Sequence, residues 1–273
     1  MPLKFMYITN DVEVAKIAED NGVEWIFIDL EINGKEDRQG HLDTVISRHS
    51  IDDVKILKRE ISKAKLLVRV NPIYDGSTKE INEVIENGAD VVMLPFFKTA
   101  NEVKTFLNVV DKRAETCLLL ETPEAVEEID EILELNGIDN IHVGLNDLHL
   151  GYGLDFMFEL LPNGTVDYLI NKINDAKINC GFGGIANLGM GMLPAEQVIA
   201  EHYRIGSNMA ILSRSFCNIK HEKNIDSIKR VFNTGISEIR NYESTLNSWS
   251  RMDFERNKRI VKEKVNLICN DIK

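Results

Sequence analysis

Five polar side chains follow short apolar runs at spacings that suit chemistry on an anionic substrate. In WIFIDLE alternate residues share a face, which places Asp29 and Glu31 together on one side of the expected strand. The same alternation places Arg69 of LLVRVNP and Glu121 of CLLLETP near the ends of two further strands, and Asp147 follows IHVGLN. Carboxylates with water and substrate oxygens suit Mg²⁺ or Mn²⁺, and an arginine stabilises a developing oxyanion.

Glu121 and Asp147 are the metal ligands that we predict. The alternative for Asp147 is that it caps the following turn. Gly144 permits close approach of the backbone, and amides near Asn146 and Asp147 could bind a substrate carboxylate together with Arg69.

Asp29, Glu31 and Arg69 form the predicted catalytic group. The structural alternative is an ion pair at the rim, for example between Arg69 and Asp29. Convergence of four such side chains from three strands favours a functional site, because polar residues at the C-terminal ends of barrel strands are catalytic in this architecture.

Eight apolar runs alternate with amphipathic stretches and must position these side chains. Strand–helix alternation repeated eight times predicts a parallel sheet closed into a (β/α)8 TIM barrel. A Rossmann fold is less favoured, because no GxGxxG follows the first run. The expected strands are Lys4–Thr9, Trp25–Glu31, Leu66–Asn71, Val91–Phe97, Cys117–Glu121, Asn140–Leu145, Asn179–Ile185 and Ile205–Leu212.

Helices are expected between the strands, with recognisable start signals. A side-chain acceptor followed three residues later by a carboxylate resembles a capping box, and proline suits the first turn. The expected helices include Val12–Asp20, Ile51–Ser62, Thr78–Asn87, Ala100–Val110 and Glu124–Leu135. The start signals are Asn10 with Glu13, Ser77 with Glu80, Thr99 with Glu102, and Thr122-Pro123; Gly22, Gly88 and Gly137 mark helix ends.

After about residue 216 the sequence predicts two helices, near 222–243 and 251–271, and no further strand. We therefore expect a catalytic barrel over 1–245 and a helical extension over 246–273. The extension would pack on the rim or on a neighbouring subunit, which favours a homo-oligomer.

Composition excludes several partners. The 273 residues carry a formal charge of -12, which argues against nucleic acid or an anionic membrane. No apolar run is long enough to span a bilayer, and the four cysteines form no CxxC pair, so we expect a cytoplasmic protein.

The segments DLE, VRVNP, GADVVMLPF, LLETPEAVEEIDEI and IDNIHVGLNDLHLGYG, in this order across about 25–215, resemble the HpcH/HpaI aldolase and citrate-lyase β-subunit family. The resemblance implies a (β/α)8 TIM barrel of the phosphoenolpyruvate/pyruvate-binding type. It also implies a carbon–carbon lyase that binds a 2-oxo acid through Mg²⁺ or Mn²⁺ and forms a metal-stabilised enolate. It implies that Glu121 and Asp147 hold the metal, that Arg69 stabilises the enolate oxygen, and that amides near Asn146 and Asp147 hold the substrate carboxylate.

One departure concerns proton transfer. The aldolase branch has a histidine after the D-x-E of its second strand, whereas Ile32 follows Glu31 here. His41 or His49 in the following loop could supply a base, or both could be solvated. Lys35 and Arg38 could bind an anionic tail or could be surface charges.

Three functions stay open from the sequence. They are a metal-dependent aldolase acting on a 2-oxo acid or its aldol adduct, a citrate-lyase-like CoA-thioester lyase, and a barrel that binds a small acid without turnover. Lys98 is a weak Schiff-base candidate and is expected at the surface. GFGGI at 181–185 and Ser213-Arg214-Ser215 are compatible with an anion site, although tight packing explains the glycines equally well.

Overall fold

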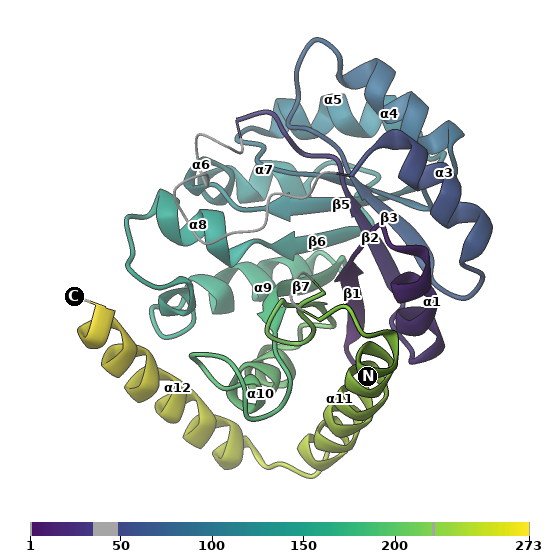
Figure 1. Cartoon of the computed structure of the whole chain (residues 1–273). Coiled ribbons are helices and arrows are strands. Elements are labelled where there is room, and N and C mark those ends of the chain that lie inside the picture. Colours follow the sequence, from purple (N-terminus) through teal and green to yellow (C-terminus); the bar gives the residue numbers. More distant parts are fainter. Residues whose placement is uncertain (1, 35–48, 220–221, 273) are drawn as a thin grey trace.

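The protein is a closed barrel of eight parallel strands in the order β1 to β8, with β8 pairing back onto β1. The computed structural model describes residues 2–34, 49–219 and 222–272 (Figure 1). The predicted TIM barrel is confirmed. The strands are β1 (Lys4–Ile8), β2 (Trp25–Asp29), β3 (Lys65–Arg69), β4 (Val91–Leu94), β5 (Glu115–Leu120), β6 (Asn140–Val143), β7 (Asn179–Ile185) and β8 (Met209–Leu212).

The strands are buried on both faces, which explains their nearly continuous apolar sequences. Inward-facing Met6, Trp25, Phe27, Leu67 and Met93 belong to a compact cluster that fills the barrel. The alternate residues pack outward against the helix layer in a much larger core. The barrel is therefore a filled core, and ligands are restricted to its ends.

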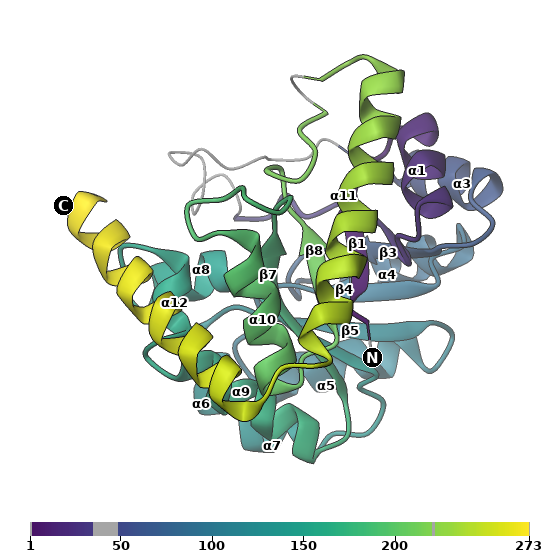
Figure 2. The ribbon, with the colours of Figure 1, turned by 90° about the horizontal axis from the view of Figure 1, so that it is seen from below.

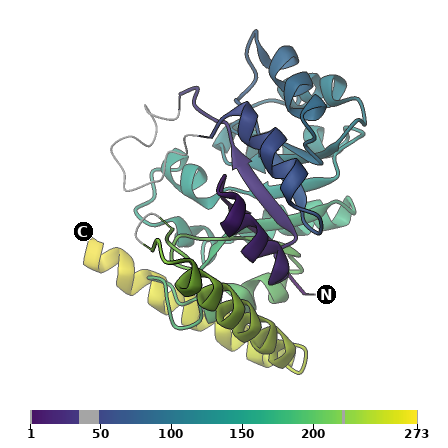
Figure 3. The same ribbon diagram turned by 45° about the vertical axis from the view of Figure 1, so that its right-hand side comes forward.

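Helices cover the outside of the barrel, and Figure 3 shows α1 in purple beside α3 in dark blue. The helices are α1 (Val12–Asp20), α3 (Ile51–Glu60), α4 (Ser77–Glu86), α5 (Ala100–Val110), α6 (Pro123–Glu127), α7 (Ile129–Leu133), α8 (Leu145–Gly151), the 3₁₀ helix η1 (Met157–Leu160), α9 (Thr165–Asp175), α10 (Ala195–Ile205), α11 (Ile225–Leu246) and α12 (Arg251–Ile272).

Two predicted caps are confirmed and two are wrong. Thr99 forms a capping box, and the Thr122 hydroxyl accepts from the backbone N–H of Ala125. Asp11, instead of Asn10, caps α1 by accepting from two backbone N–H groups of the first turn. Ser77 lies inside α4, and its hydroxyl accepts from the backbone N–H of Tyr74.

Two predicted elements have different extents. The expected helix Glu124–Leu135 is divided into α6 and α7, because Glu128 leaves the helical path and its carboxylate accepts from the backbone N–H of Ala100 at 2.7 Å. The eighth strand was expected to begin at Ile205 but begins at Met209. Ile205 is the last residue of α10, and Gly206 caps that helix in the left-handed conformation.

The two C-terminal helices pack on the outside of the barrel. α11 lies between α1 and α10 and completes the helix layer, and α12 runs along α10 (Figure 2). Buried Asn257 of α12 donates to the carbonyl of Gln197 and to Glu201 at 2.8 Å. No helix in the described part of the chain is long and apolar enough to cross a membrane.

Candidate active site

The ends of β2 and β3 place an arginine and two carboxylates side by side. Asp29 and Arg69 are register partners, so their side chains project from the same face of neighbouring strands. Arg69 donates through Nε and Nη2 to the two oxygens of Asp29, both at 2.8 Å. Its Nη1 lies 3.4 Å from Glu31, which follows β2 directly. The bidentate geometry fixes the plane of the guanidinium at the mouth of the barrel.

Arg69 stays protonated in this position. Burial by itself disfavours its charge, but the adjacent Asp29 and Glu31 carboxylates more than compensate and hold the pKa of Arg69 above its ordinary value. Asp29 and Glu31 are almost fully buried. Arg69 is therefore a fixed positive charge in a largely dehydrated site, where electrostatic interactions are stronger than in water.

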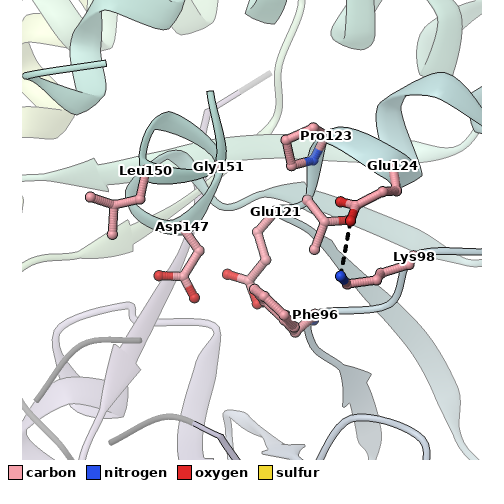
Figure 4. A pocket seen from close by; sticks show the side chains of 9 residues that line it. Phe96, Lys98, Glu121, Pro123, Glu124, Asp147, Leu150 and Gly151 are labelled. Carbon is pink, nitrogen blue, oxygen red and sulfur yellow. Dashed lines mark hydrogen bonds and ion pairs between the residues drawn. The ribbon is translucent and has the colours of Figure 1, made fainter. Parts of the chain in front are cut away.

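Glu121 and Asp147 face each other across a cavity of about 470 Å³ (Figure 4). Glu121 directly follows β5, and Asp147 lies in the first turn of α8, which begins just after β6. Both side chains are buried, with 5% and 6% of their surfaces exposed. The Asn146 side chain donates to Asp147 at 3.3 Å. The side chains of Glu121 and Asp147 thus present four carboxylate oxygens to this cavity.

Phe96 supports Glu121 through a strained backbone. Its N–H donates to Glu121 Oε1 at 3.1 Å. Its φ of 47° lies in the left-handed region, which is costly for a bulky side chain. Such strain clusters at functional sites, where it aims a group that the fold must hold. Sequence analysis missed this role, because we expected Phe96 inside a regular strand, Val91–Phe97, whereas β4 ends at Leu94.

Gly144 leaves room for Glu121. A Cβ at Gly144 would lie 2.7 Å from Glu121 Oε2 and 2.9 Å from Glu121 Cβ. Any other residue at this position would therefore displace the carboxylate. This contact gives a specific reason for a glycine at the end of β6.

The donor set at Glu121 and Asp147 suits a hard divalent cation that keeps several exchangeable ligands. Carboxylate oxygens are what Mg²⁺ and Mn²⁺ prefer, and Mg²⁺ commonly retains water or substrate oxygens in its coordination shell. Among the described residues no three His, Cys, Asp or Glu side chains form a metal-binding group. A cation held here by the described residues would therefore have Glu121 and Asp147 as its protein ligands.

A second cavity, of about 680 Å³, is lined by Arg69. It extends from Asp29 and Arg69 to the ends of β1 and β8. His49 lines it and accepts the backbone N–H of Asp29 on Nδ1 at 3.0 Å, which assigns the ring proton to Nε2. Among the loop residues that the sequence analysis singled out, His49 therefore lies beside the predicted catalytic group of Asp29, Glu31 and Arg69. His41, Lys35 and Arg38 lie outside the described residues.

Asn71 holds the start of the loop after β2, a role that sequence reasoning missed. Its side-chain oxygen accepts from the backbone N–H groups of Ile32 and Asn33, both at 2.9 Å. Its amide donates to Glu80 at 2.7 Å. Burial raises the pKa of Glu80, although the hydrogen bonds from Asn71 oppose that shift. An asparagine just past a strand, nine residues before a helix carboxylate, is too common a pattern to signal this contact.

The remaining candidates occupy structural positions. Lys98 is exposed, as expected, and pairs with Glu124 at 2.9 Å. His149 is buried, with its ring nitrogen 3.1 Å from the Leu145 carbonyl oxygen. In GFGGI, a Cβ at Gly181 would meet the Met209 carbonyl oxygen at 2.1 Å, so close strand packing accounts for that glycine.

Comparison with known proteins is consistent with this geometry. The family model described as HpcH/HpaI aldolase/citrate lyase matches residues 5–156, more than half of the chain. The chain belongs to this family. The match includes Asp29, Arg69, Glu121 and Asp147 and ends before β7, so the last two strands and the segments after them lie outside it.

Individual relatives of the family are distant. A 2-keto-3-deoxy-L-rhamnonate aldolase from Shigella dysenteriae is 22% identical over 204 residues, covering 63% of this chain and 71% of that protein. A crystal structure of an HpcH/HpaI aldolase from Desulfitobacterium hafniense has a TM-score of 0.63 at 14% identity and covers 84% of this chain and 93% of its own. A Burkholderia cenocepacia family protein has a TM-score of 0.63 at 13% identity, with coverages of 84% and 95%. These structures establish the shared fold.

Proposed function

We propose that this family member is a divalent-metal-dependent carbon–carbon lyase that cleaves or forms the aldol adduct of a 2-oxo acid. The observation that carries the proposal is the arrangement at one barrel mouth of two buried carboxylates, Glu121 and Asp147, with Arg69 fixed by Asp29. The first pair suits Mg²⁺ or Mn²⁺, and the arginine suits an oxygen that gains negative charge. The Shigella relative, named for a 2-keto-3-deoxy sugar acid, supports the same substrate class.

A bound divalent cation would supply Lewis acidity to the 2-oxo group. In the cleavage direction a base removes the proton of the 4-hydroxyl, and the C3–C4 electron pair moves into the 2-oxo group as an aldehyde leaves. The resulting enolate takes a proton at C3 and becomes the 2-oxo acid. Arg69 stabilises the enolate oxygen more than the ground-state carbonyl, which lowers the barrier.

We propose that His49 orients the 4-hydroxyl of the adduct, with its Nε2–H donating to the hydroxyl oxygen, while solvent in the cavity takes the hydroxyl proton. Nδ1 of His49 accepts the backbone N–H of Asp29, and the ring lines the cavity next to Arg69. His49 lies on the loop after β2, where the aldolase branch carries a histidine directly after D-x-E.

A metal-dependence assay separates this proposal from its alternatives. Purified protein is treated with EDTA and assayed for cleavage of 4-hydroxy-2-oxo acids, with Mg²⁺ or Mn²⁺ added back, and in parallel with a panel of acyl-CoA thioesters. We expect cleavage of the oxo acids only with metal. Thioester cleavage alone would identify a citrate-lyase-like enzyme, and metal binding without any product would identify a small-acid-binding barrel.

A further inference from the structure

Asn71 holds the backbone immediately before and after Glu31. Its side-chain oxygen accepts from the N–H of Ile32 at 2.9 Å, and its side-chain amide donates to the carbonyl of Leu30 at 3.5 Å. Between these two residues, the N–H of Glu31 donates to Asp29 at 3.2 Å. Asn71 is buried, so these contacts are shielded from competition by water. The chain is therefore fixed at three successive residues around Glu31.

Glu80 determines which end of the Asn71 side chain faces the backbone. It accepts from the side-chain amide of Asn71 at 2.7 Å and from the backbone N–H of Asn71 at 3.3 Å. An ionised carboxylate can only accept hydrogen bonds, so it draws the NH₂ group toward itself and leaves the amide oxygen for the N–H groups of Ile32 and Asn33. If the amide turned over, its NH₂ group would face two further donors. Glu80 thus selects the orientation in which Asn71 can hold the chain.

The turn between β3 and α4 brings Glu80 back to the end of the strand. The Ser77 hydroxyl accepts from the backbone N–H of Tyr74 at 2.9 Å, which closes the turn at the first residue of α4. A Cβ at Gly76 would collide with the ring of Tyr74, so the turn needs a glycine there. Glu80 lies in the first turn of the helix that follows. The short connection therefore places its carboxylate within reach of Asn71.

Glu31 is the carboxylate in this group that the strand itself does not hold. Asp29 is the last residue of β2 and binds Arg69 through Nε and Nη2, whereas Glu31 lies past the end of β2 and 3.4 Å from Nη1. Beyond the strand end, regular pairing with β3 no longer fixes the chain. The hydrogen bonds of Asn71 take over that role. They determine where the second carboxylate beside Arg69 lies.

We infer that Glu80 and Asn71 are positioning residues of the active site and act through Glu31. Glu80 orients Asn71, Asn71 fixes the backbone at Glu31, and the Glu31 carboxylate fixes the position of Arg69 Nη1. Neither Glu80 nor Asn71 is among the described residues that line the two cavities, so their effect on a ligand is indirect. A cation stabilises developing negative charge best when it is held in place before the reaction. The inference rests on the proposed function for the reaction that Arg69 assists.

The test measures exchange of the pyruvate methyl protons with deuterated solvent in the presence of Mn²⁺. Glu80→Ala should lower kcat by about ten- to a hundredfold, because a small displacement at the reacting centre has an effect of this size. The KM for pyruvate should change little, since Arg69 acts mainly on the enolate. Mn²⁺ affinity should stay the same, because Glu121 and Asp147 are untouched. Glu80→Gln should give an intermediate kcat, because its side-chain oxygen can accept from Asn71 but its amide can also turn over.

Two comparisons separate positioning from a general loss of stability. Glu83→Ala removes an exposed carboxylate of the same helix, which pairs with Lys79 at 3.8 Å, and should leave kcat unchanged. In a Glu31→Gln background, Glu80→Ala should cause little further loss of kcat, because the two residues act in one chain of contacts. Urea unfolding of each variant reports stability separately. Fully additive losses of kcat, or a Glu80→Ala variant that loses stability but keeps the wild-type kcat, would overturn the inference.

Two further measurements do not depend on turnover. Hydrogen exchange of the backbone amides of Ile32 and Asn33 should be faster in Glu80→Ala than in the wild type or Glu83→Ala. Calorimetry of the Mn²⁺-loaded protein with oxalate, a planar dianion like the enolate of pyruvate, should show weaker binding in Glu80→Ala. Wild-type pyruvate exchange with equal kcat in Glu80→Ala and Glu83→Ala disproves only this inference. Absence of pyruvate exchange in the wild type disproves the lyase, and weaker oxalate binding in Glu80→Ala than in Glu83→Ala would then retain the positioning role, whereas equal binding would overturn it.

Discussion

Asp29 accepts two hydrogen bonds from Arg69 across the β2–β3 register, so a buried carboxylate sets the orientation of an arginine that lines a cavity at the barrel mouth. The same pair links stability to activity. Removing Asp29 leaves the charge of Arg69 buried without its bidentate partner.

Asp29→Asn is therefore expected to lower both stability and activity. Loss of one partner of a buried pair is strongly destabilising, and with Glu31 still 3.4 Å away we expect a cost of about 2–4 kcal/mol. Urea unfolding measures it, and kcat/KM should fall at the same time because Arg69 is free to rotate. The control is Asp20→Asn, which removes an exposed partner of Lys63 and should leave stability unchanged. Equal effects of the two variants would contradict the role given to Asp29.

Phe96 offers a test of backbone strain. A variant with alanine is normally more stable than one with glycine at the same position. At φ 47°, however, alanine retains the left-handed strain and glycine does not. We expect Phe96→Gly to be more stable than Phe96→Ala by about 1 kcal/mol, since left-handed backbone costs about that much for an L residue. Chemical denaturation of the two variants decides it. A more stable alanine variant would mean that the position carries no strain.

Gly144→Ala should weaken metal binding, because its Cβ would lie 2.7 Å from Glu121 Oε2. Displacement of a ligand oxygen by a neighbouring side chain is expected to cost at least about tenfold in Mn²⁺ affinity, measured by calorimetry. Gly184→Ala is the control, because its Cβ would have no neighbour closer than 3.4 Å. Unchanged Mn²⁺ affinity in Gly144→Ala would argue against Glu121 as a ligand.

His142 should make the fold sensitive to acid. It is buried inside the barrel, where desolvation lowers its pKa to about 4 while the hydrogen bond to the Gly183 carbonyl opposes the shift. Between about pH 6.5 and 4 the unfolded chain binds a proton that the folded chain does not, so stability falls as pH falls through this window. The lowered pKa corresponds to a loss of about 3 kcal/mol by pH 4.

His142→Gln tests this pH dependence without removing a polar side chain. Between pH 6.5 and 4 the slope of its unfolding free energy against pH should be smaller than that of the wild type. The difference should correspond to about one bound proton. The measurement is a series of urea titrations across the pH range. Burial also lowers the pKa of His202, and the charge of His142 adds to that shift, so removing His142 should reduce the contribution of His202 in the same direction. Parallel curves would show that His142 does not contribute.

The barrel and the positions of the predicted catalytic residues could be predicted from the sequence. Side chains alternate strictly between the two faces of a strand. The sequence alone therefore predicted that Asp29, Arg69 and Glu121 lie at the same end of the barrel. Features that depend on contacts between distant segments were beyond it. The left-handed turn at Phe96 arises where the chain leaves β4 to reach Glu121, and α6 ends because Glu128 turns toward the first residue of α5.

His49 illustrates the same limit within the site. Sequence reasoning identified it only as one of two histidines in a long polar loop. Its proximity to Asp29 depends on the path that returns the chain to α3, and neither composition nor periodicity encodes that path.

The most direct test of the proposed lyase is exchange of the pyruvate methyl protons with deuterated solvent, followed by NMR in the presence of Mg²⁺ or Mn²⁺. We expect metal-dependent exchange by the wild type and its loss in Glu121→Gln and Asp147→Asn. Glu115→Gln, at the opposite end of β5, should exchange normally. Absence of exchange in the wild type, or exchange that persists in both Glu121→Gln and Asp147→Asn, would contradict the account.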